Sequence, residues 1–139
     1  MLIFTRLETI FLSILRIVSA YLFLLHGTAK FFAFPISMGG SPSSLTLMAG
    51  ILEILGGILL MLGLFTRPTA FILSGQMAVA YFMAHASKSI LFPIANGGES
   101  AVLFCFIFLY IATSGGGKWT LDNLLINQKE LKPSIIIHD

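Results

Sequence analysis

Long apolar runs, separated by short stretches rich in glycine, proline and charge, make up most of the chain. Four runs stand out, over residues 8–27, 45–65, 68–86 and 99–114. A helix needs about 20 mostly apolar residues to cross a bilayer, whereas a β-barrel strand needs only about 10 with alternating polarity. The lengths of the runs and their lack of alternation therefore predict four membrane-spanning helices.

The breaks between the runs support these limits. FPISMGGSPSS separates the first run from the second, TRPT the second from the third, KSILFPIANGGES the third from the fourth, and SGGGKW ends the fourth. Pro68 falls in the first turn of its run, where a missing N–H is tolerated. We expect an all-α fold, an integral membrane four-helix up-down bundle over residues 1–124, and a cytoplasmic C-terminal tail over residues 125–139.

Composition strengthens this assignment and narrows the partners. Of 139 residues, 57% are hydrophobic and 10% charged, and the mean hydropathy is +0.96. Soluble domains carry about 25% charged residues, so the lipid bilayer is the expected surrounding. The net charge of +2 is small and scattered, which argues against a nucleic acid partner. Cys105 is the only cysteine, so neither an internal disulfide nor a CxxC pair can form.

Positive charge is distributed unevenly between the two ends of the runs. An even number of spans puts both termini on one side, which then carries five Lys and Arg residues against two on the other. The positive-inside rule makes that side cytoplasmic and the chain a multi-pass protein of the cell (inner) membrane. A cleaved signal peptide is not expected, because the first run is too long and contains a charge. The five are Arg6, Arg67, Lys118, Lys129 and Lys132, and the two are Lys30 and Lys88.

Two charges inside the runs share a helix face with small residues. On a wheel of 100° per residue, Arg16 lies on the polar face of the first run and Glu53 on the small-residue face of the second. An unpaired charge in mid-membrane costs at least about 2.5 kcal/mol. Their estimated depths differ by about 6–8 Å, which an extended arginine can cover. We therefore expect an inward-facing Arg16–Glu53 ion pair, with either a structural or a functional role.

The remaining polar residues collect at the outer ends of the runs. An up-down bundle would bring five of them together over Glu53, in one cavity walled by Phe23, Phe106 and the glycines of the second run. Imidazoles, carboxylates and an amine suit proton handling. The alternative is that these residues have only local roles. Asn96 and Glu99 have the spacing of a capping box in NGGE, and the two histidines could lie at the membrane–water interface. No metal-ligand spacing occurs, so no metal is expected. The five are His26, Lys30, His85, Asn96 and Glu99.

Four ordered motifs resemble the DoxX family of small four-helix membrane proteins. They are LRIVSAYLFLLHGTAKF, GILEILGGILLMLGLFTRPTA, ANGGESAVLF and GGGKWTLD, and the resemblance runs from about Leu12 to Leu124. The resemblance implies a link to quinone chemistry, because related subunits are associated with a quinol oxidase and with thiosulfate:quinone oxidoreductases. It also implies a polar set that consists of Arg16, His26, Lys30, Glu53, Asn96 and Glu99.

These features together favour a membrane subunit of a quinone-linked redox complex. A quinone would be the cofactor, with Glu53, His26 and Glu99 as catalytic groups that handle protons in an apolar slot. Arg16, Lys30, His85 and Asn96 would bind the ligand. The sequence has no haem or flavin motif, so electrons would come from a redox partner subunit or from a bound substrate. The alternatives are a non-catalytic scaffold or anchor for a soluble redox partner, and a small transporter, against which the lack of inverted repeats argues.

Overall fold

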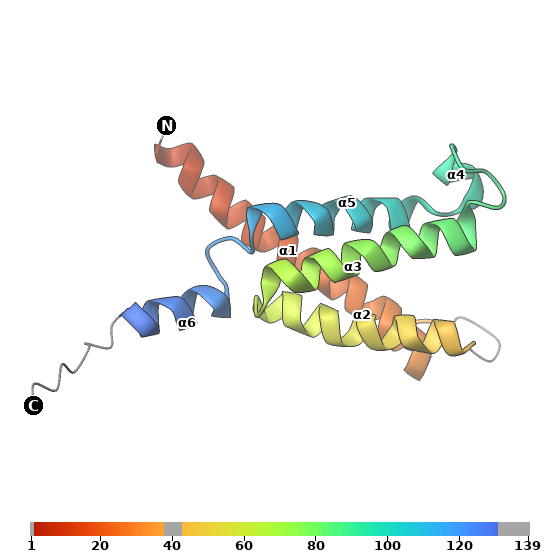
Figure 1. The fold of residues 1–139 in the computed structure, drawn as a ribbon, viewed down its shortest axis with the longest axis horizontal. Coiled ribbons are helices and arrows are strands. Elements are labelled where there is room, and N and C mark those ends of the chain that lie inside the picture. Colours follow the sequence, from red (N-terminus) through yellow and green to blue (C-terminus); the bar gives the residue numbers. More distant parts are fainter. Residues whose placement is uncertain (1, 38–42, 131–139) are drawn as a thin grey trace, which may run out of the picture.

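Helices form all the regular structure of the described chain (Figure 1). The computed structural model describes residues 2–37 and 43–130, and within them there are six α-helices, one π-helix and no strand. The all-α class expected from the sequence is therefore confirmed for this part of the chain. The elements are α1 (Leu2–Phe32), α2 (Ser44–Leu62), α3 (Thr66–Ala80), η1 (Tyr81–His85), α4 (Pro93–Asn96), α5 (Glu99–Ser114) and α6 (Leu121–Glu130).

Each apolar run forms a helix. α2, α3 with η1, and α5 end close to the limits expected for the last three runs, whereas α1 extends beyond residues 8–27 in both directions. Ser43 caps α2 by accepting a hydrogen bond from the Thr46 N–H at 3.2 Å, and the left-handed Gly63 ends it. α6 begins at Leu121, ahead of the expected tail, and residues 131–139 of that tail lie outside the described residues.

The helices pack as two pairs, α1 with α2 and α3 with α5, and the short turn between α2 and α3 connects the pairs. α1 packs along α2, and α3 along α5, while α2 also contacts α3. In Figure 1, α2, α3 and α5 run side by side and α1 crosses them at an angle. α6 leaves the bundle at the end where α2 stops and α3 begins. The polar faces of α1 and α2 are thus turned toward each other.

Glycines allow α1 and α2 to approach closely. A Cβ atom on Gly57 would lie 3.3 Å from the Ala20 carbonyl oxygen, and one on Gly27 would lie 2.7 Å from Ile54 Cγ1 and 3.0 Å from the Gly50 carbonyl oxygen. Small residues at such points let membrane helices pack through their backbones. These contacts also fix the antiparallel register, which decides what each polar side chain of α1 meets on α2.

Aromatic rings from α1 and α5 fill the centre of the bundle. The ring of Phe23 lies 5.4 Å from that of Phe104 and 4.9 Å from that of Phe108. Phe106, in contrast, is 66% exposed on the outer face of α5, so its expected place in a pocket wall is wrong. The same outer face carries Leu103 and Tyr110, both exposed. A surface covered with large apolar side chains suits lipid rather than water.

Two helices are long and apolar enough to cross a membrane, over Leu7–Phe32 and Ser44–Leu62. α5 is also apolar, over 16 residues. Candidate spans alone are weak evidence, because a core helix of a soluble protein can pass the same test. Here their outer faces carry exposed Phe11, Leu55 and Ile58, which a soluble core helix would bury. The two observations together indicate a membrane protein.

Candidate functional site

Arg16 and Glu53 do not form an ion pair, so that prediction is wrong. The guanidinium is fully buried and donates to main-chain carbonyl oxygens, with Nη1 2.8 Å from that of Met61 and Nε 2.9 Å from that of Gly116. In the α1–α2 register Arg16 lies opposite Leu60, two helical turns from Glu53, which is about 10 Å along the axis. The side chain cannot span that offset. Its acceptors are the carbonyls of Leu60, Met61, Gly116 and Trp119.

Arg16 instead caps the C-terminus of α2. Leu60 and Met61 belong to the last turn of that helix, whose carbonyl groups lack the usual N–H partner four residues on, although the Leu60 carbonyl also accepts the Gly63 N–H at 3.1 Å. A cation at this position also complements the partial negative charge of a helix C-terminus. Four of the five N–H donors of a guanidinium are thereby used on the main chain. A buried arginine in an apolar run is thus explained by the helix end that it faces.

The glycine-rich segment after α5 is held against α1 at the same end. Gly117 has a φ of +80°, and a Cβ atom there would lie 2.4 Å from Ser13 Oγ. The Trp119 N–H donates to Ser13 Oγ at 3.1 Å, and the Lys118 N–H to the Thr9 carbonyl at 3.3 Å. Only glycine combines this backbone conformation with this close approach. The segment therefore docks on α1 through its main chain.

Asp122 caps the start of α3 from outside that helix. Its two carboxylate oxygens accept the backbone N–H groups of Phe65 and Thr66, each at 2.8 Å. Burial by itself raises the pKa of Asp122, but the hydrogen bonds from Thr66 and Phe65 and the charge of Arg16 outweigh it. The pKa of this carboxyl is therefore held below its ordinary value. Sequence reasoning missed this role, because the partners are backbone groups 56 and 57 residues away.

A second arginine caps a helix at this end. Arg67 donates to the carbonyl oxygens of Thr113 and Ala112, at 2.5 and 3.3 Å, in the last turn of α5. Unlike Arg16, it is exposed. Two helix C-termini thus face cations and one helix N-terminus faces a carboxylate, which is the arrangement that helix dipoles favour.

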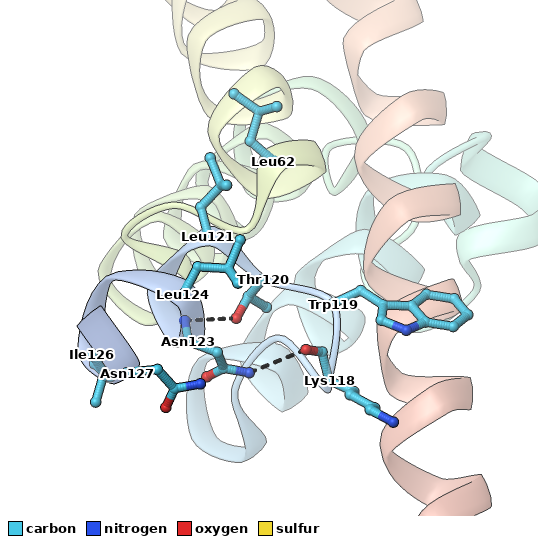
Figure 2. A pocket seen from close by; sticks show the side chains of 9 residues that line it. All are labelled: Leu62, Lys118, Trp119, Thr120, Leu121, Asn123, Leu124, Ile126 and Asn127. Atoms are coloured by element: carbon cyan, nitrogen blue, oxygen red, sulfur yellow. Dashed lines mark hydrogen bonds between the residues drawn. The ribbon is translucent and has the colours of Figure 1, made fainter. Parts of the chain in front are cut away.

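A cavity of about 700 Å³ opens beside this capped end, between the end of α2 and α6. Figure 2 shows Leu62, Leu121 and Leu124 on one side of it and Trp119 on the other. Asn123 lies between them and donates to the Lys118 carbonyl at 3.3 Å. The lining contains none of the site residues expected from the sequence. It consists of Leu62, Lys118, Trp119, Thr120, Leu121, Asn123, Leu124, Ile126 and Asn127.

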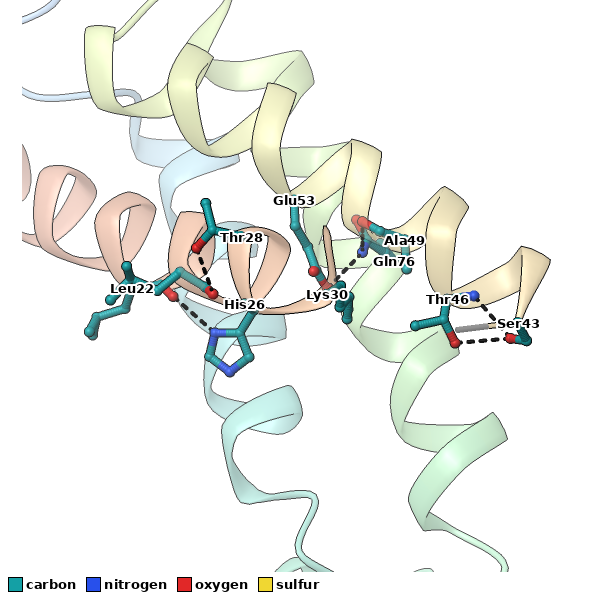
Figure 3. A network of polar contacts seen from close by, with 10 residues as sticks. Leu22, His26, Thr28, Lys30, Ser43, Thr46, Ala49, Glu53 and Gln76 are labelled. Carbon is teal, nitrogen blue, oxygen red and sulfur yellow. Dashed lines mark hydrogen bonds and ion pairs between the residues drawn. The ribbon is translucent and has the colours of Figure 1, made fainter. Parts of the chain in front are cut away.

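Lys30 is the partner of Glu53 (Figure 3). Lys30 Nζ donates to Glu53 Oε1, and the two side chains are 14% and 3% exposed. The register set by Gly27 and Gly50 brings this part of α1 against the middle of α2. A buried charge of this kind is tolerated when it is paired, and removing one partner strands the other. The structure thus assembles a buried ion pair from two of the expected site residues.

Gln76 of α3 completes this cluster. Its Nε2 donates to the Ala49 carbonyl at 3.2 Å and to Glu53 Oε1 at 3.4 Å. Glu53 Oε2 and Gln76 Oε1 are buried and accept no hydrogen bond within the described part of the chain. Leaving a buried acceptor unpaired costs about 1–3 kcal/mol. The cluster can therefore take up a proton, or accept a hydrogen bond from a donor group of a ligand.

Sequence reasoning missed Gln76. The signal was an amide within the apolar stretch SGQMAVA. Gln76 lies on a different face of the helix from Ser74. Ser74 itself donates to the Cys105 carbonyl at 2.8 Å, which ties α3 to α5.

His85 and Asn96 form a separate group with Tyr81. His85 Nδ1 lies 3.1 Å from the Asn96 carbonyl oxygen, and Asn96 Nδ2 donates to the Tyr81 hydroxyl at 3.1 Å. The π-helix η1 carries both Tyr81 and His85, whose rings are stacked 6.3 Å apart. Among the described residues no hydrogen bond links this group to Glu53. The group fixes the connection between η1 and α5.

His26 and Glu99 are exposed rather than gathered over Glu53. His26 Nδ1 lies 2.9 Å from its own helix's Leu22 carbonyl, and its ring meets Phe104 edge-on at 5.6 Å. The capping box proposed for Glu99 is also wrong, because Gly98 is the N-cap of α5. Asn96 Oδ1 accepts the Gly98 N–H at 2.7 Å. Of the five residues expected to surround Glu53, only Lys30 hydrogen-bonds to it.

Histidine, cysteine and acidic side chains do not gather as a metal site would require. Within the part of the chain that the structure describes, no three of them come together. The only ion pair that the structure describes there is the one between Lys30 and Glu53. The polar groups that the structure places together at this site are the Lys30 amine, the Glu53 carboxylate and the Gln76 amide.

The sequence motifs meet at two places in this fold. The arginine of the first motif meets GGGKWTLD and the middle of the second motif, while the lysine of HGTAK meets the glutamate of the second motif. These features define an all-helical membrane protein with a capped end and a buried ion pair. Residues 11–86 match the family model of DoxX, and the chain belongs to the DoxX family.

One relative comes from Haemophilus influenzae and is described as an uncharacterized protein. It is 56% identical over 119 residues, which cover 81% of this chain and 89% of the relative. No solved structure matches the chain. The comparisons thus give the family of the chain but not its activity.

Proposed function

We propose that this protein is a membrane subunit of a quinone-linked redox complex, with the head group of the quinone bound at Lys30 and Glu53. The observation that supports this proposal is a buried ion pair whose second carboxylate oxygen, Oε2, accepts no hydrogen bond from residues 2–37 or 43–130. Ionisable groups inside membrane helices usually mark a pathway or a site. The resemblance to redox subunits of the DoxX family points the same way.

The residues at the ion pair have the chemistry that a quinone needs. An ammonium carries three N–H donors, and the ion pair uses one of those on Lys30. Another can donate to a carbonyl oxygen of the head group. Glu53 Oε2 can accept a proton, or a hydrogen bond from a hydroxyl group of the reduced quinone, and the exposed His26 can exchange protons with the surroundings. A quinone bound there would supply two-electron, two-proton redox chemistry.

In the same proposal, four segments cross the membrane as an up-down bundle, namely α1, α2, α3 with η1, and α5. At about 1.5 Å per residue, the 16 residues of α5 extend about 24 Å, which snorkelling side chains and local bilayer thinning can extend to a full span. The charge bias of five to two then favours cytoplasmic termini and a location in the cell's inner membrane. Electrons would come from a partner subunit.

The anchor role is the second candidate, and α6 favours it. This helix lies outside the packed bundle and exposes Leu124, Leu125 and Ile126, each at least 50%. An exposed aliphatic surface at the end of a membrane protein is suited to holding a soluble partner. In that case the ion pair would serve only to fix α1 against α2.

Titration of the purified full chain with a short-chain benzoquinone tests the proposal. We expect saturable binding that Glu53→Gln weakens by about tenfold or more, because a charge-assisted contact is lost. His85→Ala is the matched control, since His85 belongs to the separate Tyr81 group, and it should leave binding unchanged. Absence of saturable binding to the wild-type chain would overturn the redox proposal and favour the anchor.

A further inference from the structure

The cavity between the end of α2 and α6 is amphipathic. Leu62, Leu121 and Leu124 supply an apolar side, and Trp119 lies on the other side of the cavity (Figure 2). Lys118 and Asn127 add an ammonium and an amide, and both residues are exposed. The lining therefore offers hydrocarbon contacts and a cationic rim within one space of about 700 Å³.

This cavity is continuous with the lipid-facing surface of α2. Leu62 is the last residue of α2 and is 50% exposed, on the same helix as the exposed Leu55 and Ile58. The end of a membrane helix lies near the head-group layer, where tryptophan and lysine are the preferred residues. Lipid that covers the outer face of α2 therefore reaches the cavity without leaving the membrane surface.

We propose that this cavity binds an anionic phospholipid. The acyl chains lie along α2 and against Leu62, Leu121 and Leu124, and the phosphate lies near the Lys118 ammonium. An anionic amphiphile matches both the apolar side and the cationic rim, whereas a soluble anion would leave the leucines exposed. Juxtamembrane lysines attract acidic lipids in the same way.

The capped end holds the cavity in shape. Arg16 fixes the Trp119 carbonyl, and Asn123 fixes those of Gly117 and Lys118, the latter two at 3.1 and 3.3 Å. Asn123 also receives support from the Thr120 hydroxyl, which accepts its backbone N–H at 3.1 Å. The residues that line the cavity are thus positioned by main-chain bonds, and no ion pair within the described part of the chain engages the exposed Lys118 ammonium.

The single tryptophan of the chain makes this proposal directly testable. The full chain is reconstituted in vesicles of phosphatidylcholine and phosphatidylglycerol at one fixed composition, in which either one lipid or the other carries brominated acyl chains. Bromine quenches the fluorescence of Trp119 only at close range. We expect brominated phosphatidylglycerol to quench more at equal mole fraction, with about a fivefold local enrichment of this lipid.

Two variants distinguish a built site from ordinary lipid contact. Lys118→Gln should abolish the preference for phosphatidylglycerol, while Lys88→Gln, an exposed lysine at the opposite end of the helices, should preserve it. Leu124→Gln should reduce quenching by both lipids, because it makes the apolar side polar. Equal quenching by the two lipids in the wild-type chain, or a preference that survives Lys118→Gln, would overturn the proposal.

Discussion

The Nε of Arg16 donates to the carbonyl oxygen of Gly116, 100 residues further along the chain, at 2.9 Å. This bond ties the middle of the first helix to the segment that follows α5. The same guanidinium caps the last turn of α2, so one buried side chain joins three parts of the chain. Arg16 therefore has a structural role, and its guanidinium lies about two helical turns from Glu53, the partner that the sequence predicts for it.

Replacing Arg16 should destabilise the protein far more than replacing Arg67. Arg16→Met strands several buried carbonyl oxygens, so we expect a loss of about 3–5 kcal/mol in unfolding free energy. Arg67→Met removes an exposed cap of the same kind and should cost about 0.3–1 kcal/mol. Thermal unfolding in detergent, followed by Trp119 fluorescence, measures both. Equal losses of unfolding free energy in the two variants would show that burial of the arginine does not determine how much its cap stabilises the protein.

Lys30 and Glu53 should be energetically coupled, whereas Arg16 and Glu53 should not. Glu53→Gln leaves the Lys30 ammonium buried without its partner, and we expect a loss of about 3 kcal/mol or more. Adding Lys30→Met should recover part of this loss, because no charge then remains at the site. A double-mutant cycle of unfolding free energies gives the coupling. The control cycle of Arg16→Met with Glu53→Gln should be additive, and coupling there would contradict the observed pairing.

The cap formed by Asp122 should make stability depend on pH. Its pKa is lower in the folded than in the unfolded state. The carboxylate therefore stabilises the fold fully above about pH 4, and this contribution is lost as the pH falls through the folded-state value. Asp122→Asn should cost about 1 kcal/mol at neutral pH. Unfolding measured from neutral to acidic pH should show the two proteins converging below about pH 4.

Close contact of α1 and α2 should make Gly27 sensitive to substitution. A Cβ atom there would meet Ile54 Cγ1 at 2.7 Å and the Gly50 carbonyl at 3.0 Å. Gly27→Ala should therefore cost about 1–3 kcal/mol through overpacking. Gly75 is the control, because a Cβ atom there has no neighbour within 4 Å, and Gly75→Ala should be neutral or slightly stabilising. Thermal unfolding of the two variants compares them, and a stable Gly27→Ala protein would argue against the close crossing.

Both termini should lie in the cytoplasm if four segments cross the membrane. The bias of five positive residues to two favours this orientation. A reporter that is active only in the cytoplasm should work when fused to the C-terminus, and one that is active only outside the cytoplasm should not. The reverse result would contradict either the number of spans or their direction.

The sequence by itself determined the helices and their inner faces. Apolar length and the spacing of small residues predicted that Ala49, Gly50, Glu53, Gly56, Gly57 and Leu60 share one face of α2; Ala49 is half-buried and the other five are buried. The inner face predicted for α1 is buried at five of its seven positions, while Lys30 is half-buried and His26 is exposed. The five buried residues are Arg16, Ser19, Ala20, Phe23 and Gly27. Such faces follow from the 3.6-residue period within one helix, so a single segment carries the whole signal.

Only the tertiary structure decided which polar groups meet. The pairing of Glu53 with Lys30 depends on the axial register of α1 and α2, which close contacts at Gly27 and Gly57 set, and a shift of two turns changes every partner. The partners of Arg16 and Asp122 are backbone carbonyl and N–H groups, which every residue possesses and no side-chain pattern marks. They become identifiable only when the ends of α2 and α3 are brought against the segment that follows α5.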